Sequence, residues 1–181
     1  MLEGPMLWFV NRGTGIVLLV LMTLTVCLGI LTSHGRAGRA VPAFVSQHLH
    51  RNVGLLSGGL LAVHAVSAVV DTYVDITWWQ ALVPWGGTYR PVWLGLGALA
   101  LDLTLAVTLT SLLRHRLSPR AWRAVHLASY LAWAVAILHG IGIGTDSRAP
   151  WSLWVNVGCL VAVVAALVQR AVVELRRTVR A

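Results

Sequence analysis

Four of the seven histidines in the sequence lie in or beside long apolar segments, where imidazole side chains are unusual. His64 and His139 are deep inside such segments, and His50 and His126 lie near the ends of the same two segments. A polar side chain at membrane depth is costly and marks a functional site by default. The other three histidines fall in expected loops or helix ends, where a solvated side chain is the simplest interpretation: His34, His48 and His115.

The spacing of these four histidines indicates what they could bind. His50 and His64 are 14 residues apart, and His126 and His139 are 13 apart. At ~1.5 Å per residue, each pair spans roughly 20 Å along a helix. If both helices cross the membrane in the same direction, His50 and His126 share an inner level, and His64 and His139 share an outer level. Two facing helices that each offer one imidazole per level provide the paired axial ligands of b-type haem. The sequence therefore predicts two stacked bis-histidine haem sites.

Helical periodicity supports this arrangement for only one of the two helices. Two side chains 14 residues apart point within about 40° of one another around a helix axis, whereas two side chains 13 residues apart point about 140° apart. We therefore expect the helix that carries His139 to bend or unwind, or His139 to lie beyond its regular part. A run of glycines where a helix end could loosen follows directly: Gly140, Gly142 and Gly144.

Other interpretations of the polar residues remain open. A metal site without haem is less favoured, because zinc ligands are usually three or four residues apart and include Cys or carboxylate. His48 is an alternative to His50, although it would lie further out of the membrane. Asp102, alone in the middle of an apolar segment, could bond to a histidine or an arginine, or pack against a neighbouring helix. The glycines between His50 and His64 could give a macrocycle room or serve close helix packing: Gly54, Gly58 and Gly59.

The elements that must position the histidines are membrane helices. Only 11% of the 181 residues are charged and 57% are hydrophobic, whereas a soluble domain has about 25% charged residues. A membrane helix needs about 20 apolar residues, and five segments qualify: about 13–32, 53–70, 92–113, 122–143 and 153–173. We expect an all-α integral membrane protein, a single domain over residues 1–181. Its five-helix bundle would hold the haems between the second and fourth helices, with no room for a separate soluble domain.

The charges predict the orientation of this bundle. All 14 basic side chains are Arg, and most flank the loops after the first and third segments or follow the fifth. The positive-inside rule then places the N-terminus outside and the C-terminus in the cytoplasm. The net charge of +8 therefore reflects topology and lipid contact, and nucleic-acid binding is not expected. Arginine without lysine is typical of a GC-rich genome, so we expect a multi-pass protein of a bacterial plasma (inner) membrane.

Two arginines are candidates for the anionic propionates of haem. Arg51 adjoins His50, and Arg90 lies in the outer loop. A planar guanidinium binds a carboxylate through two parallel hydrogen bonds. A plain interfacial charge is the equally favoured alternative for each.

Three stretches resemble the ferric reductase-like transmembrane domain. They are "HLHRNVGLLSGGLLAVHAVSAVVD" (48–71), "GGTYRPVWLGLGALALDLTLAVTLTSLLR" (86–114) and "AWRAVHLASYLAWAVAILHGIGIGTD" (121–146). That superfamily includes NADPH oxidases, ferric-chelate reductases and the bacterial haem subunit of the methionine sulfoxide reductase system. The 14- and 13-residue spacings are similar to those of its NADPH oxidase branch. The resemblance covers the second to fourth helices.

The resemblance implies two haems b and a function in transmembrane electron transfer. It assigns an inner haem to His50 and His126 and an outer haem to His64 and His139. In most of the family, electrons pass from a cytosolic flavin through both haems to an acceptor outside. Since no flavin or nicotinamide domain is expected here, the flavin would be on a partner flavoprotein or other redox partner. The acceptor could be ferric iron, oxygen, a quinone or a periplasmic protein.

Two further functions compete with this interpretation. One is the haem b subunit of a quinone-linked dehydrogenase or a cytochrome b561-type protein, which dependence on quinone would distinguish. The other is a transporter or scaffold without haem, which the absence of a Soret band would reveal.

Overall fold

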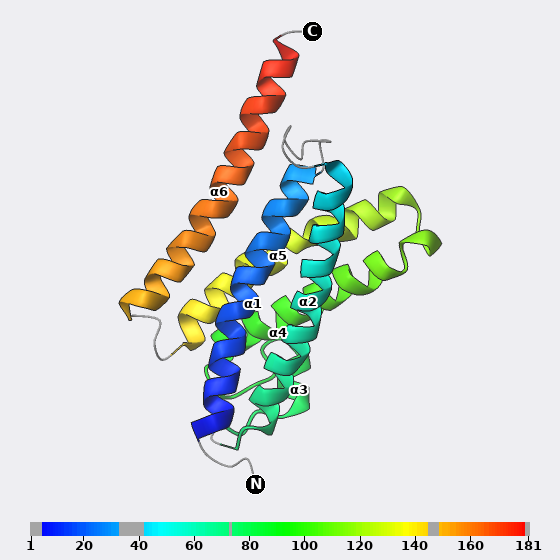
Figure 1. The fold of residues 1–181 in the computed structure, drawn as a ribbon. Coiled ribbons are helices and arrows are strands. Elements are labelled where there is room, and N and C mark those ends of the chain that lie inside the picture. The colour runs from blue at the N-terminus through cyan, green and yellow to red at the C-terminus, as the bar shows by residue number, and fades with distance from the viewer. Residues whose placement is uncertain (1–4, 33–41, 73, 145–148, 180–181) are drawn as a thin grey trace.

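The computed structural model describes residues 5–32, 42–72, 74–144 and 149–179, and all regular structure in these ranges is helical (Figure 1). The helices are α1 (Pro5–Thr32), α2 (Ala43–Val70), the short α3 (Trp78–Leu82), α4 (Pro91–Leu112), α5 (Pro119–Ile143) and α6 (Pro150–Thr178), with a 3₁₀ turn η1 (Arg114–Arg116) between α4 and α5. Within the described residues, five of these helices are long and apolar enough to cross a membrane. The prediction of an all-α protein with five candidate membrane-spanning helices is therefore confirmed.

The helices extend beyond the apolar segments that predict them. α1 begins at Pro5 and α2 begins at Ala43, each well before the predicted start. Backbone hydrogen bonds continue through polar residues that do not count toward an apolar segment. As a result, His48 and His50 both lie inside α2.

The expectation that the fourth membrane helix unwinds, or that His139 lies beyond its regular part, is wrong. α5 is a continuous α-helix from Pro119 to Ile143, and both His126 and His139 lie within it. Both imidazoles nevertheless bond to α4, through Ser111 and the backbone of Trp93. The roughly 140° between the two positions on an ideal helix therefore does not require the α5 backbone to unwind.

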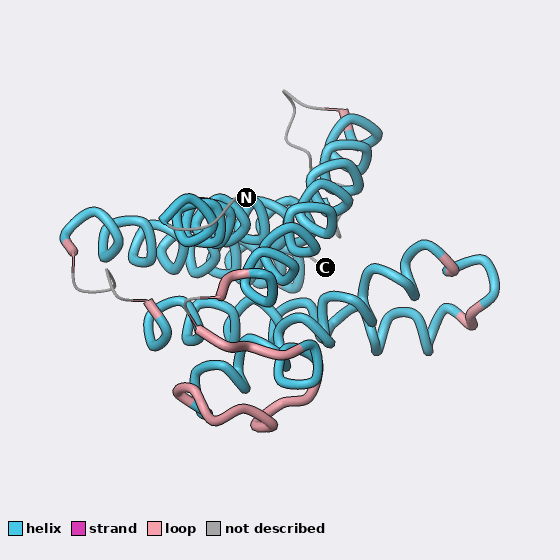
Figure 2. Tube along the Cα trace, turned by 90° about the horizontal axis from the view of Figure 1, so that it is seen from below, coloured by secondary structure: helices cyan, strands magenta, loops and turns pink. Residues whose placement is uncertain are grey.

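Two antiparallel helix pairs and one further helix build the molecule. α1 packs along α2, α4 packs along α5, and α6 lies against α1 (Figure 1). The second pair crosses the first obliquely, and from below one long helical hairpin reaches away from the rest (Figure 2). α3 packs on α4 near the end of the molecule where the chain begins. Within each pair the two helices follow one another in the chain and run antiparallel, as neighbours in other bundles do.

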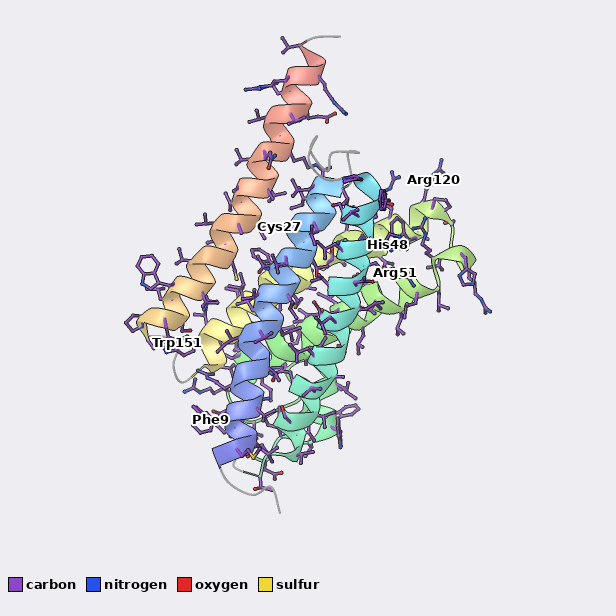
Figure 3. All side chains as sticks on the ribbon, viewed as in Figure 1. Phe9, Cys27, His48, Arg51, Arg120 and Trp151 are labelled. Atoms are coloured by element: carbon purple, nitrogen blue, oxygen red, sulfur yellow. The ribbon has the colours of Figure 1, made fainter. Side chains whose placement is uncertain are left out.

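The side chains distinguish the two ends of the molecule. Figure 3 shows His48, Arg51 and Arg120 toward the end where α5 begins, and Phe9 and Trp151 toward the opposite end. Many leucines and valines point outward, including Leu109 and Val161, as a bundle surrounded by lipid requires.

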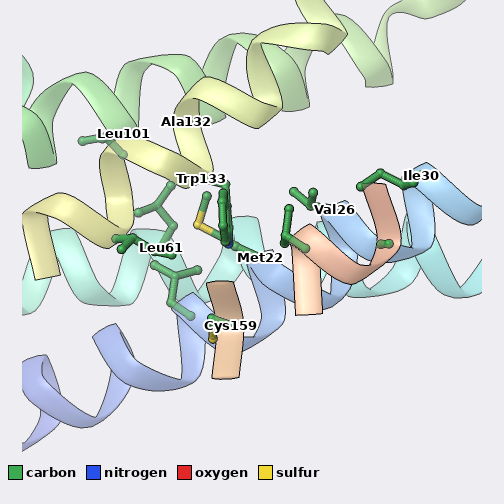
Figure 4. Packing of buried hydrophobic residues seen from close by; sticks show 12 residues of the cluster. Met22, Val26, Ile30, Leu61, Leu101, Ala132, Trp133 and Cys159 are labelled. Atoms are coloured by element: carbon green, nitrogen blue, oxygen red, sulfur yellow. The ribbon is translucent and has the colours of Figure 1, made fainter. Parts of the chain in front are cut away.

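A small buried core joins the two pairs to α6 (Figure 4). Trp133 of α5 packs against α1 at its centre, and its indole Nε1 donates a hydrogen bond of 2.9 Å to Thr23 Oγ1. Around it lie Met22, Leu61 and Cys159, from three other helices. Trp133 lies between His126 and His139 in α5, so this core separates the two histidine levels.

Candidate functional site

The inner level brings His50 of α2 face to edge with His126 of α5. Their ring centroids are 6.1 Å apart and their planes are inclined at 70°. His50 Nδ1 lies 2.9 Å from the carbonyl oxygen of Thr25 in α1. His126 Nδ1 lies 3.3 Å from Ser111 Oγ in α4. Trp122, one turn before His126, stacks on the His126 ring at 4.9 Å and 25°.

The outer level places His64 of α2 and His139 of α5 on the wall of one cavity. The cavity has a volume of about 210 Å³ and is lined by all five long helices. His64 Nδ1 lies 3.0 Å from the carbonyl oxygen of Asn11. His139 Nδ1 lies 2.8 Å from the carbonyl oxygen of Trp93. Each ring is thus anchored to the neighbouring helix of its own pair.

Three of the four imidazoles rest on a glycine of that neighbouring helix. A Cβ atom built on Gly15 would lie 3.1 Å from His64 Cε1, one on Gly29 would lie 3.2 Å from His50 Cε1, and one on Gly97 would lie 2.5 Å from His139 Cε1. These glycines were not predicted as site residues. The missing side chains let the rings approach the helix backbone closely enough to reach a carbonyl.

These contacts determine which ring nitrogen can bind a metal. When Nδ1 carries the proton and donates it to a neighbouring oxygen, Nε2 keeps its lone pair for coordination. Metal-bound histidines typically use such a second hydrogen bond to fix the ring and raise its basicity. All four histidines have an oxygen acceptor at Nδ1, so all four can act as Nε2 ligands.

The geometry of the inner pair suits one shared metal ion. The ring centroids are 6.1 Å apart and a metal–nitrogen bond is about 2 Å long, so one ion could bond to a nitrogen of each ring. Among the described residues, no group of three or more His, Cys, Asp or Glu side chains could hold a metal ion. Paired imidazoles without further protein ligands fit a cofactor that supplies the remaining ligands itself, as a porphyrin does.

Each level also has a buried polar atom without a partner in the described part of the chain. At the inner level this atom is Trp122 Nε1, and at the outer level it is Asn156 Oδ1. Asn156 lines the outer cavity together with His64 and His139. A buried polar atom without a partner is costly, so both levels offer a hydrogen-bonding group to a bound molecule.

The predicted arginines differ in their surroundings. Arg90 has a left-handed backbone (φ 39°), and its Nη1 donates to the carbonyl oxygens of Gly142 and Ile143 at 3.0 and 3.5 Å. It therefore binds the last turn of α5. Arg51 is exposed on α2. Arg12, which was not predicted as a site residue, lines the outer cavity.

The other polar candidates lie away from the paired rings. His48 is exposed, whereas His50 faces His126. Asp102 is half-buried in α4 and, within the described residues, neither lines the outer cavity nor hydrogen-bonds to any of the four histidines. His34 lies outside the described residues, and His115 is exposed in η1.

Residues 14–143 match the model of a family described as ferric reductase like transmembrane component. The matched segment begins in α1 and ends at the last residue of α5, so it contains all four histidines and the three glycines beneath them. A search of curated proteins finds no match.

Proposed function

Because the chain belongs to the ferric reductase-like transmembrane family, we propose that it transfers electrons across a membrane with two haems b. His50 and His126 would be the axial ligands of the inner haem, and His64 and His139 those of the outer haem. The observation that carries this proposal is the pairing of the four imidazoles, each with its Nδ1 beside an oxygen of a neighbouring helix.

Haem, when bound, supplies an iron that takes up and releases one electron at a time. The protein's own residues would orient the ligands and exclude water. The carbonyl oxygens of Asn11, Thr25 and Trp93 keep Nδ1 of three histidines protonated and the rings fixed. The core around Trp133 keeps the region between the levels apolar, which favours transfer of electrons without accompanying ions.

Several side chains could hold the haem propionates. Trp122 Nε1 is an available donor beside the inner level, and exposed Arg51 lies on the same helix as His50. Arg12 lines the outer cavity. Arg90 would have to exchange its bonds to the end of α5 for bonds to a propionate, and Arg12 is a second outer candidate by its place on the cavity wall.

The proposed orientation places the inner level toward the cytoplasm, with the N-terminus outside. The basic residues at the ends of α4 and α5 would then face the cytoplasm: Arg114, Arg116, Arg120 and Arg123. A partner flavoprotein or another redox protein that carries acidic groups could dock there. The proposed location is the plasma (inner) membrane, and the acceptor would be ferric iron, oxygen, a quinone or a periplasmic protein.

Single histidine substitutions test the assignment of the two sites. His50→Ala and His126→Ala should remove the same spectral component, and His64→Ala and His139→Ala should remove the other. Each variant should retain about one haem per chain by pyridine haemochrome, since one bis-histidine site remains. The matched control is His48→Ala, an exposed histidine on the same helix as His50, which should retain both haems. Loss of haem in His48→Ala but not in His50→Ala would contradict the assignment.

A further inference from the structure

We propose that Ser111 is a positioning residue that sets the reduction potential of the inner haem above the value that a glycine in its place would give. The inference rests on the proposed function, because it assumes that His126 binds haem iron. It adds a role for a side chain that belongs to neither pair of ligands.

The four histidine anchors follow one pattern with one exception. His64 rests on Gly15 and bonds to the carbonyl of Asn11, four residues earlier in α1. His50 rests on Gly29 and bonds to the carbonyl of Thr25, again four residues earlier.

In α4, the contact of His139 follows the same pattern, whereas the contact of His126 does not. His139 rests on Gly97 and bonds to the carbonyl of Trp93, four residues earlier. In α1 the two glycines are 14 residues apart, and 14 residues after Gly97 the sequence has Ser111. His126 bonds to the side-chain hydroxyl of Ser111 at 3.3 Å, and the equivalent carbonyl would be that of Val107.

The serine changes both the distance and the strength of the anchor. The three carbonyl contacts are 2.8 to 3.0 Å, whereas the hydroxyl contact is 3.3 Å. A hydroxyl oxygen is also a weaker acceptor than a peptide carbonyl. When Nε2 of His126 is bound to iron, Nδ1 carries the proton, and His126 then donates the weakest of the four Nδ1 hydrogen bonds.

A weaker hydrogen bond at Nδ1 has a defined effect on the metal. The stronger this bond, the more negative charge the imidazole carries and the better it donates to iron. Strong donation stabilises the ferric state, so it lowers the reduction potential. A serine at position 111 thus favours the ferrous state of the inner haem relative to a glycine there.

Trp122 makes the effect of Ser111 specific to the hydrogen bond. Its indole stacks on the His126 ring at 4.9 Å, which restricts the ring plane when the serine is changed. A substitution at position 111 is then expected to alter the hydrogen bond more than the orientation of the ring.

Redox titration of purified, haem-loaded protein tests the proposal. Ser111→Gly should let the His126 ring approach the Val107 carbonyl. It should thereby lower the midpoint potential of the inner haem, which is the component that disappears in His126→Ala. Ser111→Ala should remove the acceptor and raise that potential, and Ser111→Thr should leave it unchanged. A hydrogen bond contributes about 0.5–1.5 kcal/mol in total, and only the difference between the ferric and ferrous states shifts the potential, so the ratio of reduced to oxidised inner haem should change by up to about 10-fold at a fixed potential. The outer component should not move.

The control is Thr110→Ala, which removes the adjacent hydroxyl of the same helix. Thr110 Oγ1 bonds to the carbonyls of Ala106 and Val107, so its loss should leave both potentials unchanged. Unchanged inner potentials in both Ser111→Gly and Ser111→Ala, or equal shifts of both components, would overturn the role of Ser111 alone. If the unsubstituted protein has no haem component that depends on His126, the proposed function itself fails.

Discussion

The outer and inner histidine levels are built from the same four helices, yet their surroundings differ. At the outer level both rings lie on glycines, both bond to backbone carbonyls, and both face a cavity of about 210 Å³. At the inner level one ring keeps this pattern, whereas His126 is held by Ser111 Oγ and stacked on Trp122. The backbone thus provides equivalent positions at both levels, and side chains of α4 and α5 make one position different.

The comparison also separates steric from electronic effects. A glycine beneath a ring controls whether the ring can reach its anchor, whereas the anchoring atom controls how strongly the ring donates to a metal. A substitution that forces a ring off its glycine, as at Gly97, should therefore change occupancy first. Substitutions at Ser111 and Trp122 should change the properties of a haem that remains bound.

The largest effect is expected from Gly97→Val. Even the Cβ atom of the new side chain would lie 2.5 Å from His139 Cε1 and 2.6 Å from Nδ1, so the ring must leave its position. The outer haem should be lost and the inner haem retained, with haem content falling from about two to about one per chain. Gly158→Ala is the control, because nothing lies within 4 Å of a Cβ at this position of α6 and Gly158 does not line the outer cavity. Two haems with an unchanged spectrum in Gly97→Val would show that His139 is not a ligand in this position.

A smaller effect, confined to the inner level, is expected from Trp122→Leu. Loss of the stacked ring at 4.9 Å removes an aromatic contact of about 0.5–1.5 kcal/mol. The inner haem should dissociate faster, and its electron paramagnetic resonance signal should broaden as the His126 ring gains freedom. Trp122→Phe keeps a stacking partner and should stay close to the unsubstituted protein. An equal change of both haem signals would mean that Trp122 acts on the whole bundle.

The smallest effects are expected from the matched pair Gly15→Ala and Gly29→Ala. A Cβ atom would lie 3.1 Å from the ring of His64 in one variant and 3.2 Å from the ring of His50 in the other. Each ring must shift by only a few tenths of an ångström, so both haems should stay bound. Gly15→Ala should shift the midpoint potential of the outer component, and Gly29→Ala that of the inner one. Gly59→Ala, with nothing within 4 Å, should shift neither, and a crossed pattern would reverse the assignment of levels.

The five candidate membrane-spanning helices could be predicted from the sequence, but the starts of α1 and α2 could not. Lipid imposes a minimum length on each apolar segment, and this requirement identifies all five candidate spans. It says nothing about polar turns at helix ends, so the first ten residues of α2, from Ala43 onward, were missed. The continuity of α5 was also missed, because the 13-residue spacing was judged against one ideal face.

The histidines of the site could be predicted, but their supports could not. His50, His64, His126 and His139 stand out because imidazoles are rare at membrane depth. The supporting glycines lie on other helices and were not considered; the sequence analysis considered Gly54, Gly58 and Gly59, as room for a macrocycle or as close helix packing. In the structure a Cβ on Gly54 or Gly58 would meet threonine methyl groups at 3.5 and 3.9 Å, and none of the three meets a histidine ring within 4 Å.

The sequence did contain a signal for the glycines that lie beneath the histidine rings. Gly15 and Gly29 have the same 14-residue separation as His50 and His64. Helices that pair in antiparallel fashion place equal spacings side by side, so this match predicts which glycines lie beneath which rings. The anchoring of Arg90 to the end of α5 had no such signal, because its acceptors are backbone carbonyls 52 and 53 residues away.

The most direct test of the central claim is the haem content of the unsubstituted protein. The purified chain, expressed with ample haem, would be examined by a dithionite-reduced minus oxidised visible spectrum and by pyridine haemochrome. Two bis-histidine sites predict about two haems b per chain. The absence of a Soret band would contradict the account, and the four anchored imidazoles would then require another ligand.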